Sequence, residues 1–71
     1  MDENNRAIEA GRRLRELRGI RTRRGVCKET GIAYSSLQAY EEGRRNPSET
    51  VKDILAEYYG VSKASIFYPT K

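Results

Sequence analysis

The stretch Arg23–Glu41, RRGVCKETGIAYSSLQAYE, decides the fold. It predicts two short helices separated by a glycine. Thr22 has the hydroxyl side chain of a helix N-cap, so the first helix is expected to run from about Arg23 to Thr30. Gly31 can adopt the positive φ that ends a helix, a conformation that residues with a Cβ adopt only at a cost. The second helix is then expected to begin near residues 33–35 and to close at Tyr40 and Glu41.

The apolar residues of this stretch divide each helix into two faces. Val26 and Cys27 form the inward face of the first helix, Leu37 and Tyr40 form that of the second, and Ile32 lies under the turn. The residues left outside on the second helix are short or hydrogen-bonding and carry no charge: Tyr34, Ser35, Ser36, Gln38 and Ala39. Such a face fits base edges in the major groove of DNA, and we expect these five residues to contact bases.

Two starts of the second helix are compatible with the sequence. Ala33 stands at the position of the N-cap and is a poor cap, which costs about 1 kcal/mol relative to Ser or Thr. Ser35 and Gln38 could instead form a capping box that begins the helix later and partly commits both side chains to the backbone.

The same stretch resembles the helix-turn-helix of phage repressors and Cro, the xenobiotic-response-element family. The matching positions are Val26, the small residue Cys27, Gly31, Ile32, Leu37, Tyr40 and Glu41. YEEGRRNPS, from Tyr40 to Ser48, is similar to the connection that follows in the family, and YYGVSKASIF, from Tyr58 to Phe67, is similar to its closing segment.

The resemblance implies an all-α fold, a compact lambda-repressor-like domain of four to five helices. It implies that Glu41 faces inward and pairs with an arginine of the first helix of the domain. It also implies that Arg23 occupies a position from which the family contacts phosphate, and that the loop after the second helix touches the sugar-phosphate backbone.

The net charge of +4 is concentrated in one segment. Residues 12–45 hold ten arginines and lysines against four glutamates, which gives +6, whereas residues 1–11 sum to −2 and residues 46–71 sum to zero. Arginine can donate two parallel hydrogen bonds to a phosphate, so a polyanionic partner is expected. The expected phosphate contacts are Arg23, Arg24, Arg44 and Arg45.

Composition narrows the remaining function classes. Seventy-one residues allow one domain, and no apolar run approaches the length of a membrane span. One cysteine and no histidine leave neither an internal disulfide nor the usual metal sites and catalytic pairs, so we expect no metal, no cofactor and no enzymatic activity. The polar, acidic start MDENN is unlike a signal peptide. We therefore expect the protein to be located in the cytoplasm.

The rest of the chain predicts a single helical domain at residues 6–68, between a disordered lead-in at 1–5 and a tail at 69–71. Helix one is expected from Arg6 to Arg18, with Ile8, Gly11, Leu14 and Leu17 on its apolar side, and Gly19 ends it. Ser48 and Ser62 are expected to cap two further helices, Glu49 to Tyr59 and Lys63 to Tyr68.

We therefore expect a sequence-specific regulator of transcription that binds double-stranded DNA. A stand-alone Cro-like or mobile-element regulator, binding a palindromic operator as a homodimer, fits the length best, with Ile66, Phe67 and Tyr68 as the expected dimer contact. No small-molecule ligand and no membrane partner are expected. The alternative is a protein-interaction module, such as an antitoxin or an adaptor, whose protein partner would use the tyrosines near the carboxyl end.

Overall fold

The computed structural model describes residues 3–68, which form five α-helices and no strand. The helices are α1 (Glu3–Arg18), α2 (Arg23–Thr30), α3 (Tyr34–Glu41), α4 (Glu49–Tyr59) and α5 (Lys63–Phe67). The expected all-α fold is therefore confirmed. None of these helices combines the length and the apolar character needed to cross a membrane.

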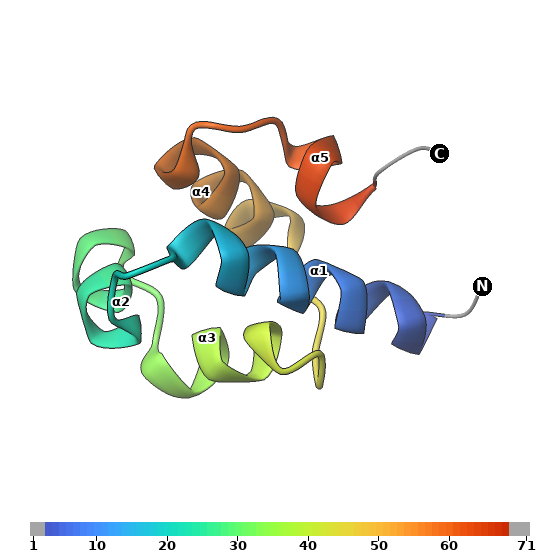
Figure 1. Ribbon diagram of the computed structural model, residues 1–71, viewed down its shortest axis with the longest axis horizontal. Helices are drawn as coiled ribbons and strands as arrows, with labels where there is room; N and C mark the ends of the chain where they lie inside the picture. The colour runs from blue at the N-terminus through green and yellow to red at the C-terminus, as the bar shows by residue number, and fades with distance from the viewer. Residues whose placement is uncertain (1–2, 69–71) are drawn as a thin grey trace.

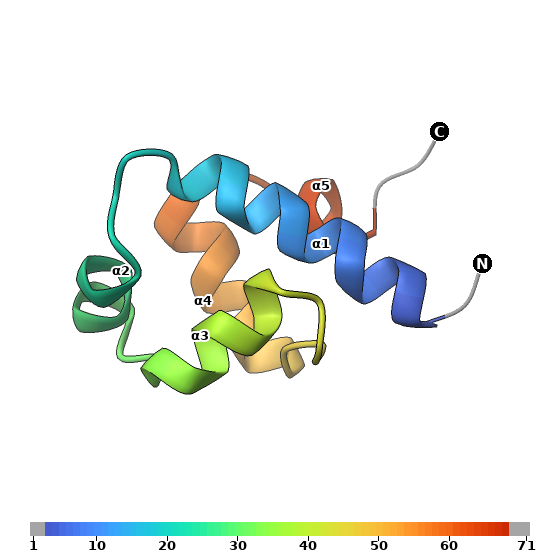
Figure 2. The same cartoon turned by 60° about the horizontal axis from the view of Figure 1, so that its bottom comes forward.

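Helix α1 is the longest helix, and the others are arranged around it (Figure 1). It packs against α3 on one side and against α5 on the other, and α4 packs against α5 and α2 (Figures 1 and 2). The fully buried apolar side chains come from all five helices, namely Leu14, Val26, Leu37, Leu55 and Ile66. One core therefore fixes the position of every helix.

Local end signals explain the bounds of α2 and α4, which agree with those predicted. The Thr22 hydroxyl accepts a hydrogen bond from the N–H of Gly25 at 3.0 Å, and Ser48 caps α4 in the same way. Gly31 ends α2 with φ of 81°, and Gly60 ends α4 with φ of 71°. These ends need no information from the rest of the chain, because each is set by its own cap residue.

Helix α1 differs from the prediction at its start. It begins at Glu3 and not at Arg6, so residues 3–5 of the predicted lead-in are helical. No glycine or proline interrupts this segment, so nothing in the sequence stops the helix from beginning earlier. Residues 1–2 of the lead-in and the predicted tail at 69–71 lie outside the described residues.

The buried face of α1 also differs from the predicted one. Ile8 is 49% exposed, while Ala7 and Ala10 are buried beside Gly11 and Leu14. The reason is close packing: a Cβ on Gly11 would lie 2.6 Å from the backbone oxygens of α3 at Tyr40 and Glu41. Small residues therefore form the contact, and a larger isoleucine is turned outward.

Helix α5 contains two of the three residues expected at the dimer contact. Ile66 and Phe67 are buried in the core of their own chain, and α5 ends at Phe67, one residue earlier than predicted. Of the three expected contact residues only Tyr68 is on the surface, where it is 42% exposed. The apolar side chains of Ile66 and Phe67 pack α5 against α1 and α4, and the expected contact with a second chain stays a prediction.

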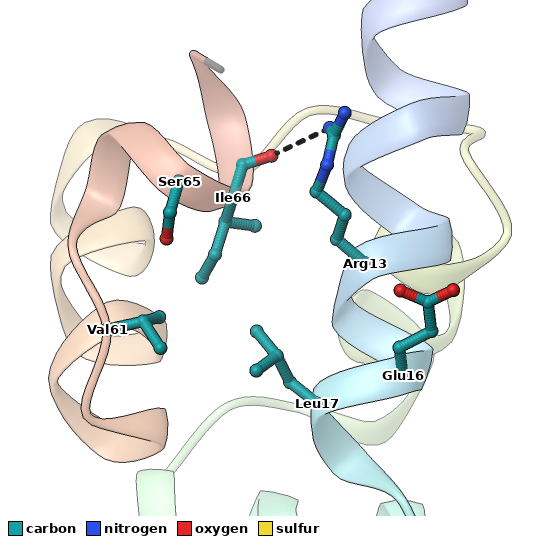
Figure 3. A pocket seen from close by; sticks show the side chains of 6 residues that line it. All are labelled: Arg13, Glu16, Leu17, Val61, Ser65 and Ile66. Atoms are coloured by element: carbon teal, nitrogen blue, oxygen red, sulfur yellow. Dashed lines mark hydrogen bonds between the residues drawn. The ribbon is translucent and has the colours of Figure 1, made fainter. Parts of the chain in front are cut away.

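An open hollow of about 230 Å³ lies between α1 and the segment around α5 (Figure 3). Its lining residues are Arg13, Glu16, Leu17, Val61, Ser65 and Ile66. The Arg13 guanidinium crosses one end of it and donates to the backbone carbonyl of Ile66 at 3.2 Å. This bond joins α1 to α5 on the side of α1 that faces away from α3 (Figure 1).

Candidate nucleic-acid interface

A buried carboxylate fixes α3 to its neighbours. Glu41, the last residue of α3, is completely buried, and each of its oxygens accepts a hydrogen bond from an arginine Nε at 2.8 Å. Arg18 of α1 binds one oxygen and Arg23 of α2 binds the other. Arg15 of α1 also donates to the backbone carbonyl of Glu41. The expected inward position and its arginine partner on the first helix are confirmed, and α2 supplies a second partner.

Arg23 has a structural contact in addition to its expected place at a phosphate. Its Nε is bound to Glu41 and its side chain is only 22% exposed. Hydrogen bonds to Glu41 and to the Tyr34 hydroxyl raise the pKa of its guanidinium, so it stays charged. A phosphate contact at this position could use only the terminal nitrogens, while the Nε holds α2 to α3.

The structure shows which of the two possible starts of α3 is correct. The helix begins at Tyr34, after Ala33 with extended backbone angles (φ −63°, ψ 144°) and no side-chain cap. Ser35 is already helical, so it cannot act as the N-cap of a capping box. The side chain of Gln38 donates instead to Glu42 at 3.2 Å. The later start is wrong, and neither Ser35 nor Gln38 serves as a cap.

Tyr34 projects from the first turn of α3 beside the arginines of α2. Its ring is exposed, and the Arg24 guanidinium lies over it at 5.5 Å from the ring centroid. A cation over the face of an aromatic ring is attracted by the ring's electron density. Arg24 and Arg23 therefore both contact Tyr34, which limits the positions of this side chain at the amino end of α3.

The outer face of α3 contains four of the five expected base-contact residues. Tyr34 and Ser35 are exposed, and Ser36 and Gln38 are partly exposed. Ala39 is only 3% exposed, so its expected outward position is wrong. The chain turns back at Gly43, and the N–H of Arg44 donates to the Ala39 carbonyl at 2.9 Å.

Three exposed arginines lie around this face, and the structure places them in different local settings. Arg24 stands over Tyr34, Arg45 lies 5.5 Å from the centroid of the Tyr40 ring, and Arg44 donates to Glu42 at 2.9 Å. Within residues 3–68, neither Arg24 nor Arg45 forms an ion pair with a carboxylate. Positive charge at the two ends of α3 is thus left available for an anionic partner.

Glu42 is a site residue that the sequence pattern did not single out. It accepts from both Gln38 and Arg44, and so it links the outer face of α3 to the turn that follows. The spacing of four residues between Gln38 and Glu42 is the signal that could have found it, since residues four apart meet on a helix surface.

Comparison with known proteins agrees with this geometry. No curated protein and no solved structure matches the chain. A family model described as a helix-turn-helix domain matches residues 9–66, which include α2, the turn and α3 and most of the helices on either side. The chain belongs to the helix-turn-helix domain family.

Proposed function

We propose that this protein is a non-enzymatic, cytoplasmic regulator of transcription that binds a specific sequence of double-stranded DNA. The observation that carries the proposal is the outer face of α3, where uncharged polar side chains lie between exposed arginines. Such a face can enter the major groove without bringing a carboxylate to the base edges in its first two turns, because the acidic residues of α3 and its C-cap begin at Glu41.

In the proposed complex the side chains of Tyr34, Ser35, Ser36 and Gln38 contact base edges. The amino end of a recognition helix enters the groove most deeply, which favours Tyr34 and Ser35. Gln38 can donate to and accept from one adenine at the same time. Ala39 is left out of this set because it is buried.

Arg24, Arg44 and Arg45 would bind the phosphates on the two sides of the groove. All three are exposed, and they come from α2 and from the turn after α3, so they flank the recognition helix in space. Contacts of this kind set the position of the protein on DNA but carry no sequence information. Arg23 would add a contact only through its terminal nitrogens.

We further propose that two copies bind one palindromic operator, in the manner of a stand-alone Cro-like or mobile-element regulator. A recognition helix as short as α3 reads few base pairs, and two half-sites one helical turn apart supply the remaining affinity. With Ile66 and Phe67 buried, Tyr68 is the one residue of the expected contact that can reach a second copy.

The test is selection of binding sites from random DNA, followed by affinity measurements over a range of salt concentrations. Three arginines in each of two copies would release counterions at six phosphates, for a log–log slope of about −5. A slope flatter than about −2, or the selection of no sequence, would contradict the proposal. A single protomer on each selected site would contradict the dimer.

Arg45→Ala and Arg12→Ala form a matched pair for this test. Arg45 lies beside α3, so its removal should weaken binding to all sequences alike and flatten the slope by about 1 for each copy. Arg12 is bound to Glu9 and Glu16 on the surface of α1, and its removal deletes the same charge without a predicted phosphate contact. Equal effects of the two variants would mean that only net charge matters.

A protein-interaction module remains the second candidate, and exposed apolar surface favours it. Ile20 is fully exposed in the turn between α1 and α2, and Tyr68 is exposed after α5. An antitoxin or an adaptor of this fold would bind its partner through such side chains. This candidate expects the salt slope to be flat and no DNA sequence to be selected, which is the opposite of the result expected above.

A further inference from the structure

Three polar side chains form a continuous chain across the carboxyl end of α3. The Nε2 of Gln38 donates to Oε2 of Glu42 at 3.2 Å, and the Nε of Arg44 donates to Oε1 of Glu42 at 2.9 Å. The Glu42 side chain is 40% exposed, so this row of hydrogen-bonded side chains lies at the surface on which α3 would meet DNA. Both carboxylate oxygens of Glu42 are thus bound, one by the proposed base reader and one by the turn after it.

The chemistry of this contact fixes the orientation of the Gln38 amide. An ionised carboxylate can only accept hydrogen bonds, so the NH₂ end of Gln38 must face Glu42 and its Oε1 must face away. Hydrogen bonds from Arg44 and from Gln38 lower the pKa of Glu42, which keeps it ionised at neutral pH. One N–H and the Oε1 of Gln38 remain for a partner outside the protein.

This orientation favours one purine over the other. In the major groove adenine offers an N–H donor at N6 and an acceptor at N7, which match the free Oε1 and the remaining N–H. Guanine offers only acceptors, at N7 and O6. The Oε1 of Gln38 is also an acceptor, so it cannot form a hydrogen bond with either of them. A Gln side chain without a fixed partner could turn its NH₂ group toward guanine, and so would discriminate less.

We propose that Glu42 is a positioning residue that orients Gln38 to read adenine and to reject guanine, and that Arg44 holds Glu42 in place. The proposal rests on the proposed function, in which α3 lies in the major groove. Glu42 is not required to touch the DNA itself, since its effect passes through the amide of Gln38.

The experiment compares the selected DNA site with its A-to-G variant at the base pair where Gln38→Ala loses discrimination. A well-formed two-pronged contact discriminates by about 5- to 150-fold, and the wild-type chain is expected to fall in that range. Glu42→Ala should reduce this ratio at least about threefold, toward the ratio of Gln38→Ala. Its affinity for all DNA should rise, because a negative charge is removed, so the ratio is the decisive measurement.

Two further variants separate positioning from charge. Glu16→Ala deletes the same charge from the surface of α1, at the hollow between α1 and α5, and should leave the A-to-G ratio unchanged. Glu42→Gln keeps an oxygen that can accept from Gln38, so it should retain more of the ratio than Glu42→Ala does. A Glu16→Ala variant that lowers the ratio equally would overturn the proposal.

The double variant Gln38→Ala/Glu42→Ala tests whether Glu42 acts through Gln38. Its ratio should equal that of Gln38→Ala alone, since there is no amide left to orient. A further change would mean that Glu42 reads the base directly, which overturns the proposal, as does a full wild-type ratio in Glu42→Ala. If Gln38→Ala loses discrimination at no base pair, Gln38 is not a reader and the proposal also fails.

These outcomes are distinct from failure of the proposed function. A wild-type chain that selects no DNA sequence overturns the proposed function, and the role of Glu42 with it. A wild-type chain that selects a site, while its Glu42→Ala variant keeps the full ratio, overturns only the role of Glu42. Melting temperatures of all variants, measured beside the affinities, show that each is folded.

Discussion

Glu41 and Glu42 are neighbours in the sequence and lie in opposite environments. Glu41 is completely buried and is bound by arginines of α1 and α2, whereas Glu42 is exposed and is bound by Gln38 and Arg44 of its own segment. One step along an α-helix turns the side chain by about 100°. Two identical side chains at the end of α3 therefore serve different purposes, because one faces the other helices and the other faces solvent.

The energetic consequences of the two positions differ in kind. The Glu41 carboxylate is removed from water, and its two arginine partners are themselves mostly covered. Loss of one member of such a group leaves charge without compensation in a region of low dielectric constant. Glu42 and its partners can bind water instead, so its loss costs the fold little. The comparison predicts that Glu41 controls stability and that Glu42 controls recognition.

The largest expected effect is that of Glu41→Ala. It should lower the free energy of unfolding by about 3–5 kcal/mol, because Arg18 and Arg23 lose their shared partner. A domain of this size has about 4–10 kcal/mol in total, so much of that stability would be lost. Urea unfolding followed by circular dichroism measures the change. Glu42→Ala is the matched control and should move the melting temperature by less than about 3 °C. Equal losses in the two variants would contradict the comparison.

The features that could be predicted from the sequence are those that neighbouring residues determine. Thr22, Gly31, Ser48 and Gly60 set the ends of α2 and α4 within a few residues of chain, and the structure confirms those ends. The position of Ala39 was not predictable in this way. Ala39 directly precedes Tyr40 and Glu41, which are also buried, so the buried face of α3 is wider than the spacing of Leu37 and Tyr40 indicates.

Residues that several helices share were predicted only in part. The family resemblance supplied the inward position of Glu41 and one arginine partner, but the second partner depends on where the start of α2 lies relative to α3. Ile8 fits the spacing of an apolar face of α1, yet it is exposed because Gly11 brings α1 and α3 into backbone contact. Helix periodicity gives the faces of one helix and does not give the distance between two helices.

Gly11→Ala is the next largest expected effect, and it tests the buried side of the comparison without a change of charge. The added Cβ would lie 2.6 Å from backbone oxygens of α3 and 2.9 Å from the Glu41 carbonyl carbon, so α1 and α3 must move apart. We expect a loss of about 1–3 kcal/mol in unfolding free energy.

Gly25→Ala is the control for this variant. It is also a glycine in a helix, but its Cβ would meet only the Thr22 hydroxyl oxygen, at 3.2 Å. The gain in helix propensity, about 1 kcal/mol, is then offset by some disturbance of the Thr22 cap. Thermal unfolding of the two variants should therefore separate them clearly. A Gly11→Ala variant as stable as Gly25→Ala would mean that the contact between α1 and α3 is not tight.

Ala33→Ser should have a smaller effect, and of the opposite sign, at the other end of α3. The carboxyl end is fixed by Glu41, while the amino end has no side-chain cap although Ala33 already has the extended backbone of an N-cap. A serine there can accept from a backbone N–H of the first turn and should raise the free energy of unfolding by about 1 kcal/mol. Ser48→Ala, which removes the existing cap of α4, should lower it by a similar amount. An unchanged melting temperature in Ala33→Ser would show that a serine side chain at position 33 does not cap α3.

The smallest expected effect concerns a third carboxylate, Glu49, which is exposed like Glu42 but has three partners. The Tyr68 hydroxyl donates to it at 2.8 Å, Lys63 at 3.0 Å and Lys52 at 3.3 Å. Hydrogen bonds from Tyr68, then from Lys63 and Lys52, lower the pKa of Glu49 from its ordinary 4.5 to about 2. A carboxylate with a lowered pKa in the folded state stabilises the fold fully above its ordinary pKa, and this contribution is lost as the pH falls toward about 2.

The difference in melting temperature between the wild-type chain and Glu49→Gln measures that contribution. It should be positive at pH 7 and should shrink between pH 5 and pH 2, where Glu49 becomes protonated and resembles the neutral amide. The difference at pH 7 should be smaller when both chains carry Tyr68→Phe, because the hydrogen bond from the Tyr68 hydroxyl to Glu49 is then absent. A difference that stays constant from pH 7 to pH 2 would mean that Glu49 is no better stabilised than a carboxylate in water. The contribution of an exposed carboxylate to stability would then be small whatever the number of its hydrogen-bond partners. Glu49, like Glu42, would be a carboxylate that the fold does not need.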